Sequence, residues 1–194
     1  MLPATYDFDS TSNTFTFYCD KTLNVRLINK GLAKIEAMPK CFYFQYEFDE
    51  NIGLEHRKDF IEFIQFPKKE NRKNLEQFVR DAVDALHITI DLYNFDTIIF
   101  PKVRSLLTQE TIEYIFMFNH PDCLNFEDLK TLNHSDKFKK LLKPKILLID
   151  DFISCKTALN SALETIKTLN PDSEIVVFSL ISKTTIARLH NPSD

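Results

Sequence analysis

One stretch, Lys145 to Leu159 (KILLIDDFISCKTAL), constrains the fold more than any other part of the chain. Four consecutive apolar residues, Ile146 to Ile149, end in the acid pair Asp150 and Asp151. A short apolar run of this kind is typical of a strand that is buried on both faces, as in a parallel sheet. The stretch therefore predicts a buried strand with two carboxylates at its tip.

An amphipathic helix is expected directly after this strand. Its predicted apolar face, at spacings of three and four, consists of Leu159, Ala162, Leu163, Ile166 and Leu169. The turn before it carries hydroxyl groups at Ser154 and Thr157. Free backbone N–H groups and the helix dipole would face the same point as the carboxylates, so the unit suits a phosphate group together with a divalent cation.

Further elements extend this unit into a βαβ series. Helical spacing begins at Asn74, and apolar segments at Thr97–Phe100 and Glu174–Ile181 indicate two more buried strands. A helix is expected from about Thr108 to Phe118, and residues 119–144 have no clean period beyond one short helix near 137–142. The series predicts a parallel sheet covered by helices, with ligands at the carboxyl ends of its strands. Two polar turns, 102–105 and 150–157, are expected at such ends.

The N-terminal part is expected to be an antiparallel β-rich element. Alternating aromatic and branched residues predict strands at Thr14–Tyr18, Asn24–Ile28 and Cys41–Phe48, with a further candidate at Phe60–Phe66. The charged segment 67–72 contains a proline and marks the change of architecture. We expect a subdomain over residues 1–70 packed on an α/β core over residues 71–194.

Composition narrows the class of protein. The 194 residues carry a formal charge of −4 and are 44% hydrophobic, which predicts a globular chain and makes nucleic acid an unexpected partner. No apolar run approaches twenty residues and no leader pattern begins the chain, so a cytoplasmic protein without a membrane partner is expected. The four cysteines are far apart in the sequence and indicate reduced thiols.

The stretch KILLIDDFISCKTAL resembles the phosphoribosyl-pyrophosphate motif of type I phosphoribosyltransferases, in which an apolar strand, two acids and a hydroxyl-rich loop precede a helix. The upstream FDTIIFPKVRSLL is similar to the first strand and pyrophosphate loop of those enzymes. The resemblance covers about residues 75–185. It implies a Rossmann-like parallel sheet flanked by helices and a Mg²⁺-dependent transfer of ribose phosphate to a nucleobase.

The resemblance also implies roles for individual residues. Asp150 and Asp151 would be the catalytic acids, facing the ribose hydroxyls and holding Mg²⁺ indirectly through those hydroxyls or water. The substrate-binding residues would be Ser154, Cys155, Lys156, Thr157, Ala158 and Leu159 around the 5′-phosphate, and Lys102, Val103, Arg104 and Ser105 around the pyrophosphate. Arg104 offers a bidentate charge and Lys102 a point charge. A homodimer is the default expectation from the family, and a protein partner stays open.

Two departures leave the activity open. Family members usually carry threonines and a glycine in the phosphate cradle, where this chain has Cys155 and Lys156, and no glycine follows Gly53. The same fold could therefore serve as a sensor of phosphoribosyl pyrophosphate or nucleotides, or as an interaction subunit. A nucleoside-triphosphatase site and a phosphoacceptor site fit less well, because each lacks its partner motif. Simple loop carboxylates, and a metal cluster of His120, Cys123 and His134, are the remaining alternatives.

Overall fold

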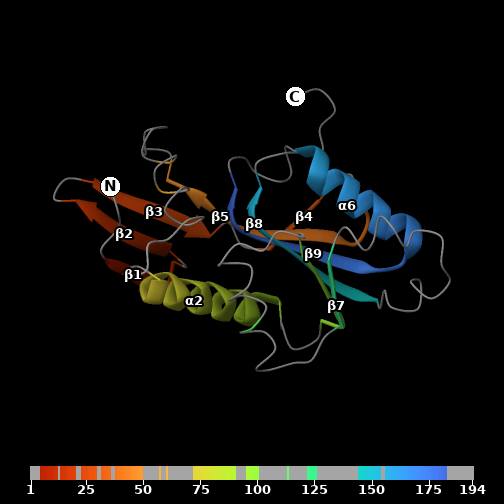
Figure 1. Ribbon diagram of the computed structural model, residues 1–194, viewed down its shortest axis with the longest axis horizontal. Coiled ribbons are helices and arrows are strands. Elements are labelled where there is room, and N and C mark those ends of the chain that lie inside the picture. The colour runs from red at the N-terminus through yellow and green to blue at the C-terminus, as the bar shows by residue number, and fades with distance from the viewer. Residues whose placement is uncertain are drawn as a thin grey trace.

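The computed structural model describes residues 5–12, 14–20, 23–29, 32–35, 38–49, 57, 60, 72–90, 95–100, 113, 122–125, 144–153 and 156–182. These residues form a mixed sheet of nine strands, covered by helices, in the strand order β1-β2-β3-β5-β9-β8-β6-β7, with β4 paired to β5 outside this path. Figure 1 shows the N-terminal strands at one end of the sheet and the C-terminal strands at the other. The chain thus has the α/β architecture that its sequence predicts.

The N-terminal strands are antiparallel. They are β1 (Thr5–Asp9), β2 (Thr14–Asp20), β3 (Leu23–Asn29) and β5 (Cys41–Phe48), with the short β4 (Ala33–Lys34) beside β5. The three strands predicted in this region are confirmed, whereas β1 and β4 were not predicted. β5 also pairs in parallel with β9, so the antiparallel strands continue directly into the C-terminal sheet.

The C-terminal strands are parallel, as predicted. They are β6 (Thr97–Phe100), β7 (Asp122–Asn125), β8 (Lys145–Ile153) and β9 (Glu174–Ser182). The prediction of an irregular segment over 119–144 is wrong at β7. That strand has only two apolar residues, Cys123 and Leu124, and it takes its conformation from pairing with β6 at all four positions.

Two long helices lie on opposite faces of the sheet (Figure 1). α2 (Arg72–Ile90) connects β5 to β6, and α6 (Lys156–Leu169) connects β8 to β9. The first connection runs toward the β7 edge and the second runs toward β5. Because parallel crossovers are almost always right-handed, connections that run in opposite directions place their helices on opposite faces.

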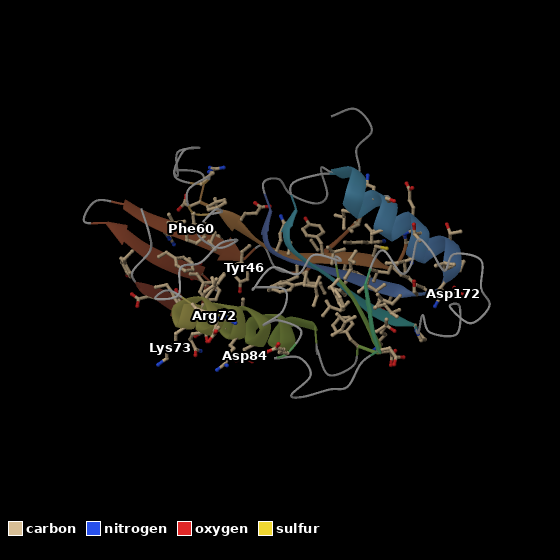
Figure 2. All side chains as sticks on the ribbon, viewed as in Figure 1. Tyr46, Phe60, Arg72, Lys73, Asp84 and Asp172 are labelled. Atoms are coloured by element: carbon tan, nitrogen blue, oxygen red, sulfur yellow. The ribbon has the colours of Figure 1, made fainter. Side chains whose placement is uncertain are left out.

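Each face of the sheet has its own core cluster. The α2-side cluster joins Leu75, Phe78 and Ala82 of α2 to aromatic residues of the N-terminal strands and to alternate residues of β8 and β9. Tyr46 belongs to this cluster and lies between the sheet and α2 (Figure 2). The α6-side cluster contains all five residues of the predicted α6 face, Leu159, Ala162, Leu163, Ile166 and Leu169. The apolar spacing therefore predicted the buried side of α6.

Three predictions concern segments of which little is described. The strand predicted at Phe60–Phe66 is wrong at its first residue, because Phe60 has a helical backbone and packs edge to face on Phe17 and Phe48. Residues 61–66 lie outside the described residues. So does the predicted helix over 108–118, except for Glu113, which is helical, and so does the short helix near 137–142.

Candidate functional site

The strand order reverses between β6 and β8, and this reversal defines the candidate site. From β6 the chain continues outward to β7, and from β8 it continues in the opposite direction to β9. The parallel register pairs Ile98 with Leu147 and Ile99 with Leu148, so the carboxyl ends of both strands point toward the same edge of the sheet. Open parallel sheets bind ligands at such a switch point, outside the carboxyl ends of the strands.

The acid pair lies within β8, rather than at its tip as the sequence predicted. β8 continues to Ile153 because β9 extends beside it, with Asp150 opposite Ser179 and Phe152 opposite Ile181. β6 ends at Phe100, one residue after its last pair with β8, whereas β8 runs five residues beyond that pair. At a rise of about 3.3 Å per residue, β8 projects past β6 by roughly 13 Å. The acids stand on this projecting part.

The helix expected to cradle phosphate begins three residues after β8 ends. Lys156, Thr157 and Ala158 form the first turn of α6, which contains no acidic residue. The first backbone N–H groups of a helix have no partner within the helix, and they attract anions. Leu159 is 4% exposed and packs in the α6-side cluster, so only its backbone is available to a ligand. Ser154 and Cys155 lie outside the described residues.

The predicted pyrophosphate turn follows β6 directly. Lys102, Val103, Arg104 and Ser105 lie outside the described residues. Lys102 is nevertheless only two residues from Phe100, the last residue of β6. In the sequence, the segments 102–105 and 154–157 therefore follow two strands, β6 and β8, that are adjacent and parallel at the switch point.

A row of polar residues crosses the sheet at the level of the first acid. Gln45 of β5 is paired with Ser179 of β9, and Ser179 is paired with Asp150 of β8. We call these three residues the polar row. The row before it is entirely apolar and consists of Phe44, Phe178 and Ile149. The change from apolar to polar at the same level on three strands was not predicted, because it becomes visible only when the strands are in register.

Gln45 is the most unusual member of the polar row. Its side chain is fully buried, and its Oε1 has no hydrogen-bond partner. Its Nε2 donates to a carboxylate oxygen of Glu47 on the same face of β5. Burial raises the pKa of the neighbouring Tyr43 hydroxyl, and the negative charge of Glu47 raises it further. The α6 side of β5 is thus polar and acidic beyond Tyr43.

A second unpaired oxygen lies near the start of α6. Asn160 follows Leu159 in the helix, and its Oδ1 is buried without a hydrogen-bond partner. Buried polar atoms usually have partners, so each exception requires an explanation. An asparagine inside a helical pattern gave no signal of this in the sequence.

A metal site within the described part of the chain would need several ligating side chains close together. The residues whose side chains are described include no group of three or more histidine, cysteine, aspartate or glutamate side chains placed to hold an ion. Cys123 lies in β7, while His120 and His134 are outside the described residues.

The chain has no significant match among protein-family models, curated proteins or solved structures. The family suggested by the resemblance therefore remains a prediction. Among the described helices, none is both long and apolar enough to span a membrane.

Proposed function

We propose that the protein binds phosphoribosyl pyrophosphate with Mg²⁺ at the switch point and transfers the ribose phosphate to a nucleobase-type acceptor, releasing pyrophosphate. One observation carries the proposal. The reversal of strand order places the acid-bearing strand β8 beside β6, the strand that leads into Lys102 and Arg104. The order β7-β6-β8-β9 also supports the Rossmann-like sheet implied by the resemblance.

Three segments of the chain would each bind a different part of the substrate. The first turn of α6, with Ser154 and Thr157, would receive the 5′-phosphate through backbone N–H groups and hydroxyls. Lys102 and Arg104 would hold the pyrophosphate as a point charge and a bidentate charge. Asp150 and Asp151 would face the ribose that joins the two phosphate ends.

Mg²⁺ suits this set of donors. The ion prefers oxygen ligands and keeps several waters when one or two carboxylates hold it. The resemblance implies that Asp150 and Asp151 would hold the ion indirectly, through water or ribose hydroxyls. When bound, the ion would neutralise charge on the pyrophosphate.

The reaction is a displacement at the anomeric carbon of the ribose. A nitrogen of the acceptor forms the new bond to carbon, the bond from carbon to the pyrophosphate oxygen breaks, and its electron pair leaves with pyrophosphate. The nitrogen loses its proton to solvent. Positive charge develops on the ribose and negative charge on the leaving group, so the two carboxylates and the two cationic side chains stabilise the transition state.

A second function is supported by Lys156. This residue begins α6 at the position where the resembled motif carries glycine. A lysine there either adds a cationic ligand for the 5′-phosphate or obstructs close backbone approach to it, since only glycine leaves that space free. The alternative is a protein that binds phosphoribosyl pyrophosphate or a nucleotide without turnover, as a sensor or an interaction subunit.

Titration calorimetry with phosphoribosyl pyrophosphate and Mg²⁺ tests both functions. The double variant Asp150→Asn plus Asp151→Asn should lose binding, because it removes both carboxylates without changing side-chain size. Asp84→Asn plus Asp172→Asn is the matched control. Asp84 lies on the exposed side of α2 and Asp172 lies beyond the far end of α6 (Figure 2). The control should bind as the wild type does.

The outcomes separate the two functions. A wild-type protein that does not bind the sugar diphosphate would exclude both. If it binds, pyrophosphate release should be measured with purines, pyrimidines and pyridines as acceptors. Release with an acceptor supports the transferase, and binding without release with any of them supports the sensor.

A further inference from the structure

The polar row contains a hydrogen-bond acceptor that the protein leaves unused. Gln45 is 0% exposed, and its Oε1 has no partner. The orientation of its amide follows from chemistry: a carboxylate accepts only, so the end that contacts Glu47 must be the NH₂ group. The carbonyl oxygen is then the end left without a partner. A ligand with an N–H group would satisfy it.

The position of Gln45 relates it to the ribose site. Gln45 and Asp150 stand in one row and are separated by a single strand, β9. Two strand spacings place their backbones about 10 Å apart. This separation suits a base at Gln45 that is attached to, or attacks, a ribose held near Asp150. Both residues also lie toward the carboxyl ends of parallel strands, where ligands bind in such sheets.

The charge near Gln45 limits which acceptors can occupy this position. Glu47 lies on the same face of β5 and is hydrogen-bonded to Gln45. A pyridine carboxylate would bring a second negative charge toward Glu47, and its ring has no N–H to donate to Gln45 Oε1. A neutral nucleobase has at least one N–H and no carboxylate.

We propose that Gln45 is a specificity-determining residue that accepts a hydrogen bond from the N–H of a neutral nucleobase and disfavours pyridine carboxylates. This inference rests on the proposed function, because it names the acceptor class of the same site. Gln45 is completely buried, so a base that reaches its amide must displace the groups that cover it.

The test uses product analogues and the variant Gln45→Met, which keeps the length of the side chain and removes its amide. Calorimetry compares the 5′-monophosphates of adenosine, guanosine, cytidine and uridine with nicotinate mononucleotide. The wild type should bind at least one of the four nucleotides about tenfold or more tightly than nicotinate mononucleotide, and Gln45→Met should lose this preference. Gln77→Met, on the exposed side of α2, is the matched control and should keep it.

Binding of phosphoribosyl pyrophosphate separates this inference from the proposed function. Gln45→Met should bind the sugar diphosphate within about twofold of the wild type, because Gln45 would contact only the base. Unchanged preference in a folded Gln45→Met, with normal binding of the sugar diphosphate, would overturn the inference and leave the proposed function intact. A wild type that binds no sugar diphosphate overturns both.

One comparison needs no variant, which matters if Gln45→Met does not fold. Wild-type protein that binds nicotinate mononucleotide as tightly as the four nucleotides, or more tightly, would refute the role of Gln45. A preference for any of the four nucleotides would support it.

Discussion

Removing the hydroxyl group from either of two tyrosines near Asp81 of α2 should change the free energy of unfolding, in opposite directions for the two residues. Tyr6 Oη donates a hydrogen bond of 2.7 Å to Asp81 Oδ2. Tyr46 is fully buried, and its Oη has no hydrogen-bond partner. Tyr6→Phe and Tyr46→Phe remove the same atom from the same type of ring, so each variant is the control for the other.

The sign of each effect follows from the contacts. The ring of Tyr46 packs edge to face on Phe15 and Phe44, with centroids 5.2 Å and 5.8 Å away, and phenylalanine keeps these contacts. An unpaired buried hydroxyl costs about 1–3 kcal/mol, so Tyr46→Phe should raise the free energy of unfolding by about that amount. Tyr6→Phe removes a hydrogen bond to a charged group and should lower it by about 1.5–3 kcal/mol.

The same pair predicts an alkaline loss of stability. Burial raises the pKa of both hydroxyls, and interaction with Asp81 raises it further. An unfolded tyrosine ionises near pH 10, so above that pH the unfolded state releases protons that the folded state keeps. This contribution to stability is present below about pH 10 and is lost as the pH rises. Above about pH 10, each Phe substitution should therefore reduce the loss of unfolding free energy by about 1.4 kcal/mol per pH unit.

Urea and thermal unfolding followed by far-UV circular dichroism measure these effects, since the chain has no tryptophan to report by fluorescence. A change of 1 kcal/mol should shift the melting temperature by about 2–4 °C for a chain of this length. Tyr18→Phe, at an exposed tyrosine bonded to Asp7, should leave the midpoint unchanged. If Tyr6→Phe and Tyr46→Phe shift the midpoint in the same direction, the prediction that one hydroxyl stabilises the fold and the other destabilises it is wrong.

Three further predictions test the core, a helix end and the candidate site. Phe78→Ala, at a fully buried ring of the α2-side cluster, should lower the free energy of unfolding by about 3–5 kcal/mol, whereas the exposed Arg80→Ala should change it by less than about 0.5 kcal/mol. Lys167 Nζ donates to the carbonyl oxygen of Ser173 at 2.6 Å near the end of α6. In the same unfolding assay, Lys167→Met should lower stability by about 1–2 kcal/mol, and no change would show that the bond is not needed. Lys156→Gly should weaken binding of phosphoribosyl pyrophosphate and flatten its salt dependence in calorimetry at two salt concentrations, and unchanged or tighter binding would mean that the lysine is not a phosphate ligand.

Local sequence patterns were sufficient to predict burial where the buried residues of a helix or strand lie close together in the chain. The five apolar residues of α6 repeat at helical spacing, and all five are in the core. The run Ile146–Ile149 is buried on both faces of the sheet, with Leu147 in the α2-side cluster and Leu148 in the α6-side cluster. In each case the residues that drive burial are contiguous or periodic, so the sequence displays them directly.

Local patterns failed where pairing with another strand decides the conformation. β7 has little apolar content and is a strand because β6 lies beside it. β8 passes beyond the acids because β9 continues alongside, which the sequence of β8 alone cannot indicate. Phe60 has an aromatic, strand-like sequence around it, yet its backbone is helical and its ring packs on Phe17 and Phe48. Tertiary contacts outweighed local propensity at each of these places.

The sequence by itself determined the buried parallel strands, the two amphipathic helices and the acid pair followed by a helix start, because each depends on residues close together in the chain. Only the tertiary structure decided the reversal of strand order between β6 and β8 and the alignment of Gln45, Ser179 and Asp150. These three residues are far apart in sequence, and the register of parallel strands is fixed by packing on both faces of the sheet. A site built across strands therefore becomes visible only once the strands are in place.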